Sequence, residues 1–164
     1  MSVHEFELAD PTATELAGAV LAGWMASRTG GVLFLSGDLG AGKTSLARGL
    51  LHAWGVQGAV RSPSYTLVEP YECDGRVVLH MDLYRLRDPD EFEGLGLRDF
   101  SPDHSWWIIE WPEHGQGYLP APTLGLSLAI RGSGRRLTLQ RGALPDADYE
   151  ALSSVLERAL LGRS

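Results

Sequence analysis

Apolar residues occur along this chain in short runs, most of which have the length and the flanking residues of β-strands. Runs of about four to eight apolar or alternating residues, bounded by glycine, proline or aspartate, are typical of strands. Two short turns, at residues 73–76 and 132–134, lie between neighbouring runs and predict hairpins. The pattern predicts strands at residues 4–8, 32–36, 65–71, 77–83, 105–111, 124–130 and 135–140.

Helical spacing appears between the early strands. Thr12 and Glu15 have the spacing of a capping box, so we expect a helix from there to about residue 27. A second helix is expected at residues 43–54, directly before Gly55, because glycine commonly ends a helix.

Two further helices complete the pattern. A short acidic one is expected at residues 88–94, and a last one at about residues 146–161 with Asp146 as its cap. Strand–helix units mixed with hairpins are typical of the α/β class with a mixed sheet. No linker divides the chain, so we expect one domain over residues 1–164.

Composition narrows the class of protein. The 164 residues include 14 Lys and Arg against 21 Asp and Glu, a formal net charge of -7. That balance argues against broad binding to a nucleic-acid backbone, which needs a positive surface. Cys73 is the only cysteine, so an internal disulfide is excluded and a reducing compartment fits. We see no signal peptide or membrane-spanning run, and we expect a cytoplasmic protein without a membrane partner.

One segment carries a specific chemical signal. Residues 37–44, Gly-Asp-Leu-Gly-Ala-Gly-Lys-Thr, match the pattern G-x-x-x-x-G-K-[ST] without a gap. Glycines let the backbone turn so that successive N–H groups point at one anion, and the following helix adds its positive N-terminal end. The lysine reaches the outer phosphates, and the threonine hydroxyl can bind Mg²⁺. The motif therefore predicts a nucleotide-phosphate site.

The identity of the basic residue in this loop favours one nucleotide. Lys43 is the only lysine among the 14 Lys and Arg residues, and it stands where a compact ammonium is needed and the wide fork of arginine would not fit. Ras-type GTPases recognise guanine with an Asn-Lys-x-Asp loop, which a chain without a second lysine cannot contain. We therefore expect ATP rather than GTP as the ligand.

Two apolar runs, residues 77–82 and 106–110, each end in an acid. A site for Mg²⁺ and a nucleotide needs a carboxylate near Thr44, usually at the end of a strand beside the phosphate-loop strand. We expect both Asp82 and Glu110 to face the phosphates, one holding the metal and the other orienting or deprotonating the attacking water. The residues alone leave open which acid does which.

Four segments together resemble the TsaE family, also called YjeE, small P-loop ATPases of bacterial tRNA threonylcarbamoyladenosine synthesis. They lie in the family's order and spacing at residues 37–45, 62–68 (Ser-Pro-Ser-Tyr-Thr-Leu-Val), 80–86 (His-Met-Asp-Leu-Tyr-Arg-Leu) and 109–113 (Ile-Glu-Trp-Pro-Glu). Many families share the phosphate loop, whereas the combination of the last two segments is far more specific. The resemblance implies a P-loop NTPase-like α/β fold of three layers, with a mixed central sheet flanked by helices.

The resemblance also implies roles for individual residues. Thr44 and Glu110 resemble the family's Mg²⁺ ligands, while Asp82 resembles the acid needed for hydrolysis and Lys43 the residue that stabilises phosphate charge. Residues 62–68 resemble a switch-like loop near the γ-phosphate, with Thr66 as its polar member. The nucleotide-binding set implied in this way is Thr14, Asp38, Leu39, Gly40, Ala41, Gly42, Lys43, Thr44, Ser45, Thr66 and Trp111.

For activity, the resemblance implies hydrolysis of ATP by a protein that acts with two partners, TsaD and TsaB. We expect turnover by the chain alone to be slow, because no arginine finger is recognisable in its sequence. TsaD would transfer the threonylcarbamoyl group to the adenosine beside the anticodon, and the present chain would support its turnover. Its contact to tRNA is expected to be indirect, and the sequence leaves direct contact open. Two alternatives stay open on the residues alone: a small-molecule kinase, although no arginine-rich lid is recognisable, and a binding module whose hydrolysis is incidental.

Two other features are left with open roles. Arg131, Arg135 and Arg136 straddle a predicted hairpin and form the best local basic patch, for a nucleotide, tRNA or an acidic partner, or simply for solvent. His80 stands two residues before Asp82 on one face of a predicted strand, but no third ligand has the spacing of a zinc site. We expect it to be packed or hydrogen-bonded.

Overall fold

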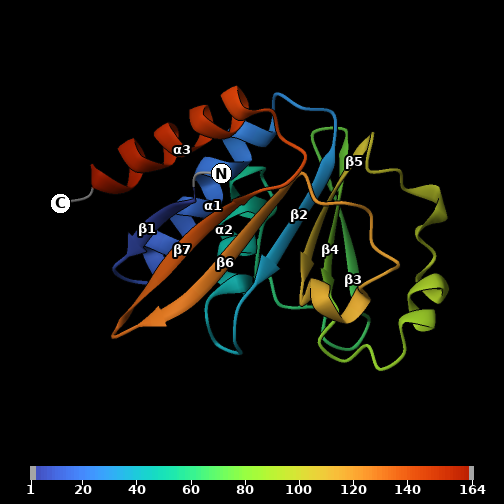
Figure 1. Ribbon diagram of the computed structural model, residues 1–164. Coiled ribbons are helices and arrows are strands. Elements are labelled where there is room, and N and C mark those ends of the chain that lie inside the picture. Colours follow the sequence, from blue (N-terminus) through green and yellow to red (C-terminus); the bar gives the residue numbers. More distant parts are fainter. Residues whose placement is uncertain (1–2, 163–164) are drawn as a thin grey trace.

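The computed structural model describes residues 3–162; residues 1, 2, 163 and 164, at the two ends of the expected domain, lie outside the described part. Within that part, seven strands form one mixed sheet in the order β1-β7-β6-β2-β5-β4-β3 (Figure 1). The strands are β1 (His4–Leu8), β2 (Gly31–Ser36), β3 (Val68–Cys73), β4 (Arg76–Asp82), β5 (Ser105–Glu110), β6 (Leu124–Arg131) and β7 (Gly134–Arg141). The helices are α1 (Pro11–Met25), α2 (Lys43–Ala53) and α3 (Asp146–Leu161), and three 3₁₀ helices are η1 (Pro89–Leu95), η2 (Leu97–Asp99) and η3 (Pro112–Gly115).

The centre of the sheet is parallel and its margins are antiparallel. Strand β2 pairs in parallel with β5 on one side and β6 on the other, and β4 pairs in parallel with β5. At the margins, β7 runs antiparallel to both β6 and β1, and β3 runs antiparallel to β4. Because β2, β5 and β4 point the same way, their last residues Ser36, Glu110 and Asp82 lie at one edge, where ligand sites form in α/β sheets.

The two faces of the sheet are covered differently. All three α-helices pack on one face, where they share a core with alternate residues of the strands, such as Trp106 and Ile108. Their neighbours in β5, Trp107 and Ile109, point to the other face, where the 3₁₀ segments and their loops cover a second, smaller core (Figure 1). The alternation follows from the two-residue period of a strand. The predicted α/β class with a mixed sheet flanked by helices is confirmed.

Helices α1 and α2 approach so closely that no side chain fits between them at two points. A Cβ added at Gly18 would lie 2.1 Å from the carbonyl oxygen of Leu46, and one at Gly49 would lie 2.0 Å from that of Glu15. Glycine is therefore required at both positions. This contact fixes α2, which follows the phosphate-loop motif, against the helix that carries Thr14.

The predicted starts of two helices are wrong by one or two residues. Helix α1 begins at Pro11, and the carboxylate of Asp10 accepts a hydrogen bond from the Ala13 amide at 2.8 Å, so Asp10 is the cap. Thr12 lies inside the helix, and Glu15, its predicted partner, forms an ion pair with Arg48 of α2 at 3.3 Å. Proline at the first helical position moves the cap to the residue before it.

At α3 the cap position belongs to Pro145, and Asp146 is the first helical residue. Its carboxylate pairs with Arg141 instead of capping the helix. The expected acidic helix at residues 88–94 is the 3₁₀ helix η1, with Asp88 as its cap.

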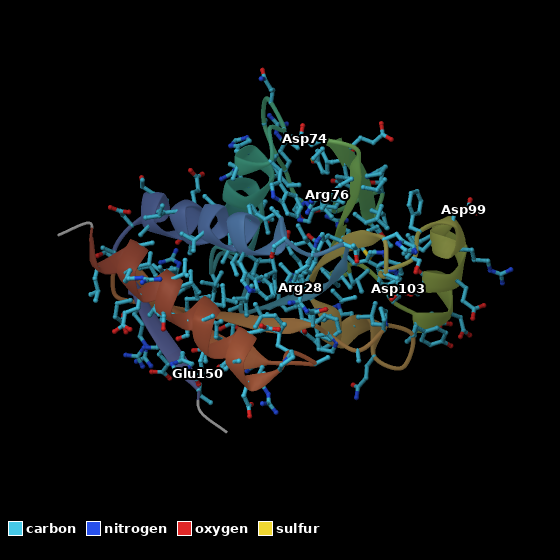
Figure 2. All side chains as sticks on the ribbon, turned by 90° about the horizontal axis from the view of Figure 1, so that it is seen from above. Arg28, Asp74, Arg76, Asp99, Asp103 and Glu150 are labelled. Carbon is cyan, nitrogen blue, oxygen red and sulfur yellow. The ribbon has the colours of Figure 1, made fainter. Side chains whose placement is uncertain are left out.

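The hairpin between β3 and β4 confirms one prediction and corrects another. Asp74 and Gly75 form its two-residue turn, and both have left-handed φ angles, 52° and 77°. Strand β3, however, begins only at Val68, since Leu67 has a φ of 66° that no extended strand contains. The first residue of β4, Arg76 (labelled in Figure 2), donates hydrogen bonds to the carbonyl oxygens at the end of α1.

Across residues 3–162, no helix combines the length and the apolar character needed to cross a lipid bilayer.

Candidate functional site

The loop at residues 37–44 joins β2 to α2 and depends on glycine backbone. Gly42, directly before α2, has a φ of 107°, a conformation that side chains disfavour. A Cβ at Gly37 would lie 2.4 Å from the carbonyl oxygen of Leu128 in β6. The loop therefore leads closely past β6 and into the first turn of α2, whose free N–H groups and positive end attract anions such as phosphate.

Lys43, the first residue of α2, is folded back over this loop. Its Nζ donates hydrogen bonds to the carbonyl oxygens of Gly37 at 2.6 Å and Asp38 at 2.9 Å. The same nitrogen lies 4.4 Å from the centre of the Trp111 ring. Burial lowers the pKa of the Lys43 ammonium, while the negative charge of Glu110 opposes that shift.

Glu110, at the end of β5, is held by two side chains. The Thr44 hydroxyl lies 3.1 and 3.2 Å from its two carboxylate oxygens, and the His80 imidazole Nε2 lies 2.6 Å from Oε2. Glu110 is 2% exposed and His80 is fully buried. The expectation that His80 is packed or hydrogen-bonded is confirmed.

Asp82, at the end of β4, lies directly beside Glu110 in the sheet register. Its Oδ2 accepts a hydrogen bond from the hydroxyl of Ser62, and its Oδ1 accepts one from the Tyr84 backbone amide at 2.9 Å. Each carboxylate is therefore fixed by its own pair of donors, and both face the 37–44 loop.

These groups surround a pocket of about 300 Å³. A second pocket of about 100 Å³ adjoins it, since Gly40, Gly42 and Ser45 line both. The lining of the larger pocket is Leu39, Gly40, Gly42, Lys43, Thr44, Ser45, Ser62, Ser64, Asp82, Tyr84, Glu110 and Trp111. The lining of the smaller one is Asp10, Pro11, Thr14, Gly40, Gly42, Ser45, Ser133, Gly134 and Arg135.

The sequence model of the family "Threonylcarbamoyl adenosine biosynthesis protein TsaE" matches residues 8–138 of this chain. The chain belongs to the TsaE family. A Haemophilus influenzae relative, named tRNA threonylcarbamoyladenosine biosynthesis protein TsaE, is 47% identical over 108 residues, which are 66% of this chain and 68% of the relative. A Bacillus subtilis protein of the same name is 34% identical over 110 residues, 67% of this chain and 68% of that protein. The crystal structure of Bacillus subtilis YdiB matches with a TM-score of 0.72 at 26% identity, covering 96% of this chain and 95% of that one.

Most residues that the TsaE resemblance assigned to the site lie around the two pockets. Thr14 lines the smaller pocket, and Trp111 lines the larger one with a left-handed φ of 58°. Asp38 and Ala41 contribute through backbone carbonyls, to Lys43 and Arg135 respectively. The left-handed backbone of Trp111, a non-glycine residue directly after β5, is a strained conformation of the kind that is often found at functional sites.

The TsaE-like loop at residues 62–68 supplies different residues from the one expected. Thr66 is exposed and does not line either pocket, whereas Ser62 and Ser64 line the larger pocket. Tyr65 and Thr66 are exposed and Leu67 packs against the second core, so residues 65–67 do not line the larger pocket. The sequence signal for this side of the pocket is the pair of serines that flank Pro63, small hydroxyls in the loop before β3.

Arg135 is a further residue of the TsaE site whose role the sequence left open. Its Nε donates to the carbonyl oxygen of Ala41 at 3.1 Å and its Nη2 donates to that of Gly40 at 3.2 Å. Arg136, next along β7, points to the other face of the sheet, where it pairs with Glu7 at 2.8 Å and Glu5 at 3.8 Å. The predicted basic patch is thus divided between two faces.

The oxygen donors near α2 fit a magnesium ion that takes most of its ligands from a nucleotide and water. They fit less well a metal whose ligands are all protein side chains. Among residues 3–162, no cluster of three or more His, Cys, Asp and Glu side chains could hold a metal ion. Mg²⁺ in nucleotide sites binds one or two protein oxygens and takes its other ligands from phosphates and water. A threonine hydroxyl within 3.1 Å of a carboxylate, as in Thr44 and Glu110, is such a donor set.

Proposed function

We propose that this TsaE-family chain binds ATP with Mg²⁺ and hydrolyses it, in the cytoplasm, during tRNA threonylcarbamoyladenosine synthesis. The observation that carries the proposal is the pair of buried carboxylates, Asp82 and Glu110. They lie side by side and line the same pocket as the 37–44 loop. Two buried acids need a positive counterpart. A lysine, a helix N-terminus and a bound Mg²⁺ ion would together supply it.

The two adjoining pockets suggest how the nucleotide lies. Gly40, Gly42 and Lys43 line the larger pocket beside the N-terminus of α2, so this pocket would take the phosphates. The smaller pocket, lined by Thr14 and Arg135, would take the nucleoside part. Gly40, Gly42 and Ser45 line both pockets, so one extended ligand can reach from one to the other across the loop.

The two carboxylates differ in what they can do. Glu110 touches the Thr44 hydroxyl, so this pair would hold Mg²⁺, which neutralises charge on the phosphate oxygens when bound. Asp82 is tied to Ser62 and the Tyr84 amide, with one hydrogen bond on each oxygen. Each oxygen keeps a second lone pair, with which Asp82 would orient and deprotonate the attacking water.

We propose TsaD and TsaB as the partners, with TsaD the transferase and contact to tRNA indirect. Within the described residues, no arginine lines the larger pocket, and arginine side chains are common accelerators of phosphoryl transfer. Hydrolysis by the isolated chain should therefore be slow. A partner that reshapes the pocket would raise its rate.

The decisive experiment measures phosphate release from Mg·ATP by wild type and by Asp82→Asn, alone and with TsaD and TsaB. Loss of the proposed base should slow release by about 10²- to 10⁴-fold while ATP binding is retained. Asp103→Asn is the matched control, because this exposed aspartate (Figure 2) lies in the loop before β5 and should leave the rate unchanged. A pull-down with and without ATP tests the partnership.

Two outcomes would contradict the proposal. Stoichiometric transfer of the phosphate to a metabolite would identify a small-molecule kinase. Full tRNA modification by Asp82→Asn, with hydrolysis abolished, would identify a binding module whose hydrolysis is incidental.

A further inference from the structure

We propose that His80 positions Glu110 for metal binding and that the Mg²⁺ dependence of nucleotide affinity depends on this buried histidine. The inference rests on the proposed function, because it concerns the same Mg²⁺–ATP site. His80 is a positioning residue in this proposal: it touches Glu110 and lines neither pocket.

The contact between the two side chains is short and buried. Nε2 of His80 lies 2.6 Å from Oε2 of Glu110, with the histidine 0% and the glutamate 2% exposed. An ionised carboxylate only accepts hydrogen bonds, so Nε2 must carry the proton and donate it. A charge-assisted bond of this length, shielded from water, is among the stronger ones in proteins.

The histidine has no other polar partner within residues 3–162. Its second nitrogen, Nδ1, is buried and has no hydrogen-bond partner among the described residues. A polar ring buried in a core is costly, and an aliphatic side chain would fill the same space without that cost. The contact with Glu110 is therefore the physical reason for a histidine at this position.

Geometry shows what that contact does for Glu110. The carboxylate meets His80 at one oxygen and the Thr44 hydroxyl at both, which fixes the rotation of its plane. Neighbouring strands hold the two residues in place, since β4 and β5 pair in parallel from Val77 to Asp82. Partners of this kind orient metal ligands, and their removal typically lowers metal affinity by about 10- to 100-fold.

The test is calorimetric titration of ATP into wild type and variants, once with Mg²⁺ and once with EDTA. The measured quantity is the Mg²⁺-dependent gain, the ratio of the two affinities. His80→Leu keeps the volume and removes the donor, so its gain should fall about 10- to 100-fold while the affinity in EDTA stays at the wild-type value. His80→Gln places an amide N–H close to the position of Nε2 and should restore the gain.

A purely structural role would give different results. Wild-type gain in His80→Leu, or an equal loss with Mg²⁺ and with EDTA, overturns the inference. If His80→Leu does not fold, His80→Asn replaces it, because its shorter amide cannot reach Glu110; equal gains in the Asn and Gln variants then overturn the inference. Wild-type protein whose ATP affinity does not respond to Mg²⁺ contradicts the proposed function itself, so the two failures are distinguishable.

Discussion

Two groups of residues approach the 37–44 loop from opposite sides of β2, and they act on it by different means. On the β5 and β4 side, Glu110 and Asp82 are buried and held by hydrogen bonds from Thr44, His80 and Ser62. On the β6 and β7 side, Arg135 reaches across to backbone carbonyls of the loop. In the proposed function the first side would supply charge for chemistry, whereas the second supports the shape of the loop.

The two sides of the proposed ATP site should therefore have separable effects. Substitutions on the carboxylate side should change the response to Mg²⁺ or the rate of hydrolysis. Substitutions on the hairpin side should change nucleotide affinity without regard to the metal.

Glu110→Gln should have the largest effect. The amide keeps the shape of the side chain but removes the negative charge that would bind Mg²⁺ in the proposed function, so ATP affinity with Mg²⁺ should fall by about 100-fold or more, with little change in EDTA. Isothermal titration in the two buffers measures this. Glu72→Gln, at an exposed position in β3, is the control. An unchanged response to Mg²⁺ in Glu110→Gln would remove this residue from the metal site.

Arg135→Gln should weaken ATP binding to the same extent with and without Mg²⁺, by roughly tenfold. The guanidinium makes two charge-assisted hydrogen bonds to the loop, and it is partly exposed, so the lower end of the usual range applies. Arg136→Gln, one residue further along, faces away and should bind ATP as wild type does. If Arg135→Gln lost ATP affinity only in the buffer with Mg²⁺, the proposed difference between the carboxylate side and the hairpin side would be wrong.

Ser62→Ala should slow hydrolysis by roughly fivefold and leave ATP affinity unchanged. The substitution removes one hydrogen bond to Asp82, worth about 1 kcal/mol, and leaves the carboxylate charge in place. Steady-state assays of phosphate release separate kcat from KM. Ser154→Ala, exposed on α3, serves as the comparison. A rise in KM at constant kcat would show that Ser62 binds the nucleotide instead of holding Asp82.

Tyr149→Phe should have the smallest effect, and the effect concerns the stability of the fold. Tyr149 lies in α3, which packs against β7 of the hairpin side. The hydroxyl of Tyr149 donates to the carbonyl oxygen of Leu139 in β7 at 3.0 Å, and burial raises the pKa of Tyr149 above its usual value of 10.0. A raised pKa means that this group stabilises the fold below about pH 10 and that its contribution is lost as pH rises through the folded-state pKa. Tyr149→Phe should therefore cost about 1 kcal/mol at pH 7 and less at pH 11, measured by urea unfolding.

An equal loss of unfolding free energy at pH 7 and pH 11 in Tyr149→Phe would contradict this prediction. Burial also raises the pKa of Tyr71 and of Cys73, so the variant should keep part of the alkaline instability of wild type.

The carboxylate side was predictable because it depends on local rules. An apolar run that ends in an acid places that acid at the edge where parallel strands end, and Asp82 and Glu110 lie there in register. Likewise, the glycine pattern of residues 37–44 determines the backbone whatever surrounds it. The strands, the three α-helices and the β3–β4 turn were accessible for the same reason, whereas the placement of all three α-helices on one face of the sheet was not predicted.

The hairpin side was not predictable because it depends on long-range geometry. Arg135 and Arg136 are neighbours in sequence, and only the pairing of β7 with β6 and β1 decides which of them reaches Gly40 and Ala41. The resemblance implied Thr66 as the polar residue of the 62–68 loop, whereas Ser62 and Ser64 line the larger pocket. The difference has a related cause, since the left-handed residue Leu67 turns the chain. Side-chain direction in a loop follows from such backbone details, which the residue types alone do not specify.

The close approach of α1 and α2 at Gly18 and Gly49 bears on which parts of the molecule can move. With backbone against backbone, the two helices cannot slide or separate without losing van der Waals contact along their length. Thr14 and Ser45 therefore lie on two helices that cannot move relative to each other, which keeps their spacing across the smaller pocket constant. Any conformational change that the proposed hydrolysis requires would then fall to the loops that carry Ser62 and Trp111, and engineering aimed at turnover should leave the glycines untouched.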